Sequence, residues 1–347
     1  MMNEDAYRVD HRLPATPSTV VWGFLGPDVA PALRVRSGEV VEIDTVNPIG
    51  VPPDAAGFYG RHGIALEGAI ADTMRILETV RKDVGPHVLT GPVHVEDARP
   101  GDALAVEVLA VEPRAPYFGV NFTRPEAGSL PGTVAQNWLK LVRYDMRRRI
   151  AQFDSRIEIP LAPFMGTMGV APTTRVSSIP PGSFGGNIDL KDLRPGATLY
   201  LPVQVPGALF FTGDGHAVQG NGEVNLTALE TAMTATLRFV LHRDSALRWP
   251  MAETAEHYIV LGLDEDLDRA ACGAVERSVD VLVAFAGLGR VDAYSLASLV
   301  VDLEVTQIVD GVKGVHARIP KRLVAPQRAS PWGPLPAHAA PAGQRSP

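Results

Sequence analysis

A glycine-rich segment at residues 213–223 carries the side chains best suited to chemistry in this sequence. It places Asp214, His216 and Glu223 among four glycines, together with the carboxamides of Gln219 and Asn221. Glycine adds nothing to a hydrophobic core, but it lets the backbone approach a neighbour or a ligand closely. Asp, Glu and His are ligands for divalent cations, and His and Glu are common general bases. The segment therefore predicts a catalytic or metal-binding site.

Local geometry suggests how these residues share one cation. Asp214 and His216 lie two apart, so on an extended strand their side chains share a face, and Glu223 follows a glycine-rich turn that can fold back. Asp189 is a second acidic candidate close to two glycines. We predict Asp214, His216 and Asp189 as metal ligands and Glu223 as the general base, so that Asp214, His216 and Glu223 form the catalytic set. Two alternatives stay open: Glu223 is itself a ligand, or these side chains cap turns.

Composition limits the partners and the compartment. Of the 347 residues, 46% are hydrophobic and 20% are charged, which is enough for a large core. A net charge of -7, with no cluster of Lys and Arg beyond residues 147–149, argues against a nucleic-acid partner. No apolar run approaches bilayer length, and the acidic start does not resemble a signal peptide. We therefore expect no membrane partner and a cytoplasmic location, and the single cysteine, Cys272, agrees with a reducing compartment.

Short β-rich runs between glycines and prolines dominate the chain. Residues 39–45, 102–111 and 198–200 each follow a turn, and the first two alternate apolar with polar residues as half-buried strands do. The apolar run at 199–211 is typical of one buried strand broken by two prolines. These patterns predict a β-sandwich or a jelly-roll-like barrel.

Helical spacing is confined to a few segments. Apolar residues recur at helical intervals in 66–82, 264–286 and 292–299, the last leading into a strand-like run at 302–309. Residues 226–241 fit both patterns, and Thr, Phe and Val favour a strand in the second half. We divide the chain into a lead-in (1–29), a β-rich part (30–200) with a helical insertion near 64–83, a part with the site motif and α+β structure (201–323), and a disordered Pro/Ala-rich tail (324–347).

Several ordered blocks resemble the acetamidase/formamidase family. The glycine-rich segment, with the Pro and Gly positions just before it, is similar to the core motif of that family. The resemblance extends over residues 30–323, which is most of the chain. It rests on residues 214–223, 201–209, 89–102, 163–172, 180–189, 302–307 and 314–316.

The resemblance implies a mainly β fold with some α, namely a jelly-roll-like β-sandwich plus a smaller α+β part. It implies hydrolysis of a short linear amide, of the formamide or acetamide type, and a divalent metal held by acidic and histidine positions. We expect a small-molecule amide as the substrate and a homo-oligomer as the assembly. The chain departs from the family at residues 47–82, and Phe184 stands where some relatives have a histidine. A repurposed or non-catalytic relative that binds a small metabolite or a metal is therefore the alternative.

The residues themselves favour activated water as the nucleophile. Cys272 falls on a helix face that we expect to be buried, which suits a core residue, and the sequence has no Gly-x-Ser-x-Gly elbow. A divalent metal lowers the pKa of water toward about 7 and polarises the carbonyl. Oxygen ligands around one central histidine predict zinc or calcium.

Asn187, His87 and Gln219 are the candidates for substrate binding. Asn187 either orients a substrate carbonyl or tolerates a left-handed turn after two glycines. His87 precedes a family-like block and either lines the pocket or is satisfied within a loop.

Overall fold

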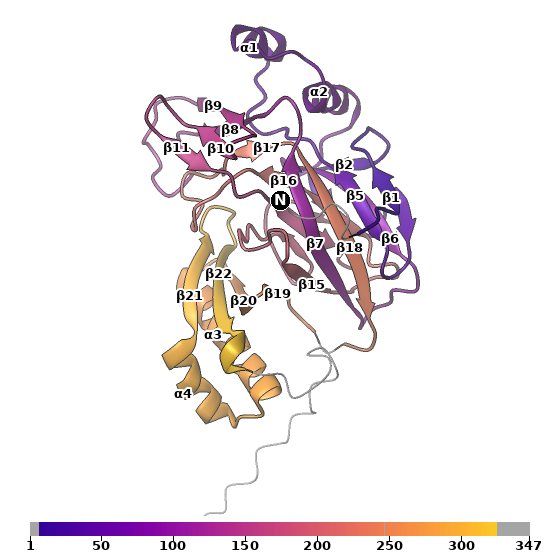
Figure 1. Ribbon diagram of the computed structural model, residues 1–347, viewed down its shortest axis with the longest axis vertical. Helices are drawn as coiled ribbons and strands as arrows, with labels where there is room; N and C mark the ends of the chain where they lie inside the picture. The colour runs from indigo at the N-terminus through magenta and orange to yellow at the C-terminus, as the bar shows by residue number, and fades with distance from the viewer. Residues whose placement is uncertain (1–6, 246, 325–347) are drawn as a thin grey trace, which may run out of the picture.

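Two large β-sheets form most of the molecule. The computed structural model describes residues 7–245 and 247–324. The sheets have nine and eleven strands, and a third sheet pairs β3 (Phe24–Leu25) with β13 (Val176–Ser177). Buried side chains from both large sheets, among them Leu104, Phe239, Phe210 and Met168, belong to one hydrophobic core. The predicted mainly β fold with some α is confirmed (Figure 1).

The nine-stranded sheet joins the two ends of the chain. Its first strand lies close to the N-terminus, and its last two strands form a hairpin close to the C-terminal end of the described chain. In order across the sheet, its strands are β1 (His11–Leu13), β5 (Val40–Asp44), β18 (Met233–His242), β7 (Ala103–Pro113), β15 (Thr198–Pro202), β19 (Met251–Glu253), β20 (His257–Asp264), β22 (Lys313–Pro320) and β21 (Asp302–Gln307).

The eleven-stranded sheet carries the glycine-rich segment. Its main path is β11 (Glu158–Pro160), β10 (Ile150–Gln152), β9 (Trp138–Asp145), β8 (Phe118–Thr123), β17 (Glu230–Thr231), β16 (Phe210–His216), β12 (Phe164–Val170) and β14 (Gly185–Asn187). Off this path, β6 (Val88–Val95) pairs with β16, β2 (Val20–Trp22) and β4 (Leu33–Val35).

The apolar run at 199–211 is not one strand. Its first part is β15 in the nine-stranded sheet, and its end is the start of β16 in the other sheet. The connection contains Pro206, Gly207 and two residues with positive φ, Ala208 and Leu209. Proline lacks a backbone donor, and left-handed residues cannot continue a ladder, so the chain crosses between sheets here.

The described part of the chain contains four α-helices, which lie at two places on the molecule. They are α1 (Ala55–Arg61), α2 (Ala69–Thr79), α3 (Leu267–Ala286) and α4 (Arg290–Val300), and a 3-10 turn, η2 (Lys321–Leu323), follows β22. Figure 1 shows α1 and α2 at one end, near β8 and β17, and α3 and α4 with β20, β21 and β22 at the other. No helix among the described residues is long and apolar enough to cross a membrane. The patterns predicted α2, α3 and α4, but α1 was not foreseen as a separate helix.

The helix α3 shows why one prediction was wrong. Asp266 caps its N-terminus by accepting a hydrogen bond from the backbone of Arg269, and Gly287 ends it with φ of 66°. The buried face includes Ala270 and Ala274, four residues apart, and packs against β20 and β22. Cys272 lies on the opposite face and is exposed, so it is not a core residue.

Both ends of the described chain pack against the rest of the structure. The lead-in contributes β1, which pairs in parallel with β5, and β2, which pairs with β6. Val324 is buried in the hydrophobic cluster that includes Ala270 and Ala274 of α3. The rest of the predicted tail, residues 325–347, lies outside the described residues.

His316 in β22 is fully buried and makes one side-chain hydrogen bond, between its Nδ1 and Oγ1 of Thr306 at 2.8 Å. Its Nε2 lies 3.8 Å from Oδ2 of Asp192 and 3.8 Å from Oε2 of Glu304, beyond hydrogen-bond range. Burial lowers the pKa of His316 from 6.5 to about 4, although both carboxylates oppose the shift. The folded protein therefore holds this imidazole in its neutral form.

We expect His316 to make the protein acid-sensitive. Because its folded pKa lies below that of the unfolded chain, the stability it contributes is complete above pH 6.5 and is lost as the pH falls toward 4. The loss is at most about 3 kcal/mol. Denaturant unfolding at several pH values should show a smaller decline between pH 6.5 and 4 for His316→Gln than for the parent. The exposed His62→Gln should keep the parent slope, and equal slopes in all three proteins would contradict the assignment.

Candidate active site

The strand β16 positions Asp214 and His216 on one face. Two glycines alternate with them, and a Cβ at Gly213 would lie 2.4 Å from the carbonyl oxygen of Val88 in β6. A Cβ at Gly215 would lie 2.3 Å from Met233. The glycine face is therefore closely packed, which directs both polar side chains into the interior, where both are buried. Asp214 and His216 therefore share one face of β16, as predicted.

His216 stands between two carboxylates. Its Nε2 lies 3.4 Å from Oδ2 of Asp214 and 3.3 Å from Oε1 of Glu230. These spacings suit two ligands of one ion, because ligand bonds are only about 2 to 2.6 Å long. Glu230 reaches this position because β17 pairs with β16, with Glu230 directly opposite His216.

Gln219 determines which nitrogen of His216 is free. Its Nε2 donates to the backbone oxygen of Asp189 at 3.0 Å, so its Oε1 faces Nδ1 of His216, at 2.9 Å. An amide oxygen only accepts, so Nδ1 carries a hydrogen, and Nε2 is the nitrogen available to a cation. That nitrogen points to Asp214 and Glu230 and has no hydrogen-bond partner among the described residues. Gln219 thus orients His216 rather than standing free for a substrate.

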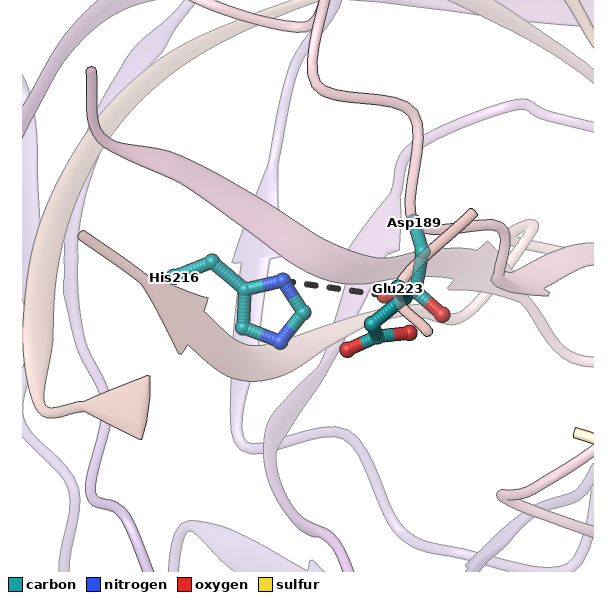
Figure 2. A group of neighbouring side chains, drawn as sticks. All are labelled: Asp189, His216 and Glu223. Atoms are coloured by element: carbon teal, nitrogen blue, oxygen red, sulfur yellow. Dashed lines mark ion pairs between the residues drawn. The ribbon is translucent and has the colours of Figure 1, made fainter. Parts of the chain in front are cut away.

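A second acidic pair, Asp189 and Glu223, lies next to His216. Figure 2 shows Asp189 and Glu223 next to His216, with Oδ1 of Asp189 3.8 Å from Nδ1. Ligand atoms of these three buried residues lie within 4.8 Å of one another, as do those of Asp214, His216 and Glu230. Asp189, Asp214 and Glu223 all have positive φ, at 49°, 56° and 46°. Such conformations are costly outside glycine and gather at functional sites.

The hairpin of β21 and β22 completes the site from the other end of the chain. Gln307 accepts hydrogen bonds from the backbone of Val309 and Asp310 and so shapes the turn that presents Asp310. Asp310 accepts a hydrogen bond from Asn187 at 3.1 Å, and Asn187 accepts one from Thr167 at 2.7 Å. The Asn187 amide therefore holds Asp310 in place.

Backbone contacts join the same hairpin to the loop of Glu223. Gly222 donates to the backbone oxygen of Thr306 at 3.0 Å and accepts from Ile308 at 3.2 Å. These two hydrogen bonds hold the loop of Glu223 against the hairpin of β21 and β22 and so position Glu223.

His87 approaches from β6. Its Nδ1 lies 3.1 Å from both the backbone oxygen and Oγ of Ser178, and its Nε2 lies 3.9 Å from Oδ1 of Asp214. The structure thus brings six of the seven predicted site residues together, and the seventh, Asn187, adjoins them through Asp310. The six are Asp189, Asp214, His216, Glu223, His87 and Gln219.

The electrostatics are those of crowded buried carboxylates. Burial, with repulsion from Glu223 and Asp310, raises the pKa of Asp189 well above its ordinary range, and burial does the same for Glu223. Burial raises the pKa of Asp310 to about 6. Burial also opposes ionisation of Asp214, but His87 and His216 hold its pKa well below the usual range. Burial disfavours the charged form of His216, yet Glu230 and Asp214 raise its pKa well above the ordinary value.

The cluster fits a divalent cation. Both carboxylate oxygens of Asp189 and Nε2 of His216 are buried without hydrogen-bond partners among the described residues. Gly166 in β12 faces the same space, because a Cβ there would lie 2.6 Å from Asp189, 2.7 Å from His216 and 2.8 Å from Asp214. A cation needs buried oxygen and imidazole atoms that have no other partner, and a space that no side chain fills.

Sequence reasoning missed Glu230 and Asp310. Glu230 lies in a segment whose periodicity was ambiguous, and Asp310 follows a predicted strand in an unremarkable turn. A charged residue in the mostly apolar run at 228–233 was the available signal for Glu230.

Known proteins similar to this chain agree on the family. The model of the Acetamidase/Formamidase family matches residues 65–178 and 175–323. A putative formamidase of Schizosaccharomyces pombe is 25% identical over 311 residues, 70% of each chain, and an acetamidase of Mycolicibacterium smegmatis is 25% identical over 290 residues, 65% of this chain and 66% of the relative. The crystal structure of an acetamidase from Bacillus halodurans has a TM-score of 0.76 at 28% identity, covering 90% of this chain and 98% of that one. With the family model matching most of its length, the chain belongs to the acetamidase/formamidase family of amidohydrolases.

Proposed function

We propose that the protein hydrolyses a short linear amide, of the formamide or acetamide type, to a carboxylate and ammonia. The observation that carries this proposal is the buried cluster around His216, in which ligand atoms without partners face one another in a member of an amidohydrolase family. When bound there, a divalent cation supplies a polarised carbonyl and a more acidic water.

We propose Asp214, His216 and Glu230 as the residues that hold the cation. Nε2 of His216 lies 3.4 Å from Asp214 and 3.3 Å from Glu230, whereas Asp189 lies 3.8 Å from Nδ1, which already contacts Gln219. One imidazole and two carboxylates suit zinc better than calcium, which prefers six to eight oxygens. This set adds Glu230 to the ligands predicted from the sequence, and it leaves Asp189 to the second acidic pair.

The remaining residues move the protons. Glu223 removes a proton from the attacking water, since burial gives its carboxylate a high proton affinity. Asp310, whose pKa burial raises to about 6, can take up a proton during the reaction and release it to the leaving nitrogen as the C–N bond breaks. Asn187 and Gln219 position Asp310 and His216 through the hydrogen bonds described above.

An ammonia-release assay on formamide, acetamide, propionamide and butyramide tests the proposal, with the metal content measured on the same preparation. We expect ammonia from at least one amide, loss of release after chelation and recovery with zinc. Recovery with calcium alone would change the metal assignment. A fully metal-loaded protein that releases no ammonia would instead support the metabolite- or metal-binding alternative. The homo-oligomer and the cytoplasmic location stay predictions.

A further inference from the structure

Glu223 lies in a strained loop with little apolar packing. Gly222 and Glu223 both have positive φ, at 98° and 46°, and a residue with a side chain rarely adopts such a value. Strain of this kind persists only where surrounding contacts hold the backbone. Glu223 is buried, but Gly220 and Val224 on either side of it are exposed. The hydrogen bonds of the loop therefore decide where the Glu223 side chain lies.

Asn221, two residues before Glu223, ties the loop to the hairpin of β21 and β22. Its Nδ2 donates to Oε2 of Glu304 in β21. The other oxygen of Glu304, Oε1, accepts from Arg318 of β22 at 3.1 Å, so both oxygens are engaged and the orientation of the carboxylate is fixed. A hydrogen bond to a charged acceptor is stronger than one between neutral groups. Asn221 therefore adds a strong side-chain contact to the backbone bonds of Gly222.

Asn225, two residues after Glu223, ties the other end of the loop to β8. Its Nδ2 donates to Oδ1 of Asn121 at 2.7 Å, and its Oδ1 accepts from Nδ2 of Asn121 at 3.2 Å. Asn225 also donates to Oγ1 of Thr123 at 2.9 Å. These contacts are independent of the hairpin, because β8 and β21 belong to different sheets.

We propose, building on the proposed function, that Asn221 and Asn225 are positioning residues that hold the carboxylate of Glu223 in the cluster around His216 from both sides. Their side chains bond to Glu304, Asn121 and Thr123, none of which belongs to that cluster. Both asparagines therefore act through the backbone of Glu223. A displacement of about 1 Å at a catalytic site costs on the order of 10²-fold in rate, so loss of either contact should slow the reaction.

Alanine variants remove each contact separately. Asn221→Ala and Asn225→Ala should each lower kcat roughly 10- to 100-fold, while KM for the preferred amide changes less than about threefold and the metal content stays full. The variants should fold, because Gly222 keeps its bonds to Thr306 and Ile308, and Val224 still accepts from the backbone of Ser129 at 2.7 Å.

Two further changes identify the partner of Asn221. Glu304→Ala should match Asn221→Ala in kcat, whereas Glu304→Gln should stay within about threefold of the parent, because its amide oxygen can still accept from Asn221. Asn47→Ala is the matched control. It removes an asparagine side chain that bonds to the backbone of Ile49, outside the cluster, and it should keep parent kcat.

Combination with Glu223→Gln distinguishes positioning from a general loss of structure. In that background, replacing Asn221 or Asn225 should change kcat less than about twofold, because no base remains to be positioned. A further tenfold loss in the Glu223→Gln background would overturn the inference. Parent-like kcat in both single alanine variants would overturn it as well, while the proposed function would stand.

Crystal structures of the parent and of the two alanine variants test the same inference without turnover. They decide it even if the parent hydrolyses no amide and the proposed function fails. A shift of the Glu223 carboxylate by about 1 Å or more supports the inference, since that is the displacement that affects catalysis. A carboxylate that stays in place in both variants overturns it.

Discussion

Glu223→Gln should lower kcat by roughly 10²- to 10⁴-fold while the metal content stays nearly full. Glutamine keeps the size of the side chain and removes its basicity, and a general base acts mainly in the transition state, whereas a ligand also holds the ion in the ground state. The loop bonds from Gly222 to Thr306 and Ile308 do not involve the Glu223 side chain, so the loop should keep its position. Metal stoichiometry and steady-state turnover on the preferred amide are the two measurements.

Asp214→Asn is the variant to compare with Glu223→Gln, because it removes a proposed metal ligand instead of the proposed base. Its Oδ2 lies 3.4 Å from the free Nε2 of His216, so loss of the carboxylate should remove metal and activity together. A metal-free Glu223→Gln protein would make Glu223 a ligand, and Asp189 would then be the next residue to test as the base.

Gly166→Ala should abolish tight metal binding with little change in folding. The added Cβ would lie 2.6 to 2.8 Å from atoms of Asp189, His216 and Asp214, closer than real Cβ atoms approach their neighbours. These side chains are buried and held by their neighbours, so they must shift, and a displacement of about 1 Å at a catalytic site costs on the order of 10²-fold in rate. We expect at least that loss in kcat/KM and a comparable loss in zinc affinity, measured by competition with a chelator.

Gly60→Ala provides the control for an added methyl group, because no atom lies within 4 Å of a Cβ at that position of α1. It should keep parent affinity and turnover. Normal zinc binding by a folded Gly166→Ala protein would contradict the proposal that Asp214 and His216 hold the cation beside Gly166.

Local pattern explains the parts of the fold that were predicted. The three long helical patterns became α2, α3 and α4, and the strand-like runs at 39–45 and 102–111 became β5 and β7. Each of these helices buries one face, so the spacing of its apolar residues is visible in a short window. The same reasoning failed for Cys272, because the small residues around it give no contrast between the two faces of α3.

Local sequence predicted the side chains at the centre of the candidate site, because Asp214 and His216 share a strand and Glu223 follows within one short loop. Glu230 and Asp310 were found from the three-dimensional structure. Glu230 arrives by the pairing of β17 with β16, and Asp310 by the hairpin of β21 and β22, which lies far along the chain. The tertiary structure also assigned the tautomer of His216, through Gln219 and the backbone of Asp189. These features depend on contacts between distant segments, and the local spacing of residues does not indicate which distant segments contact each other.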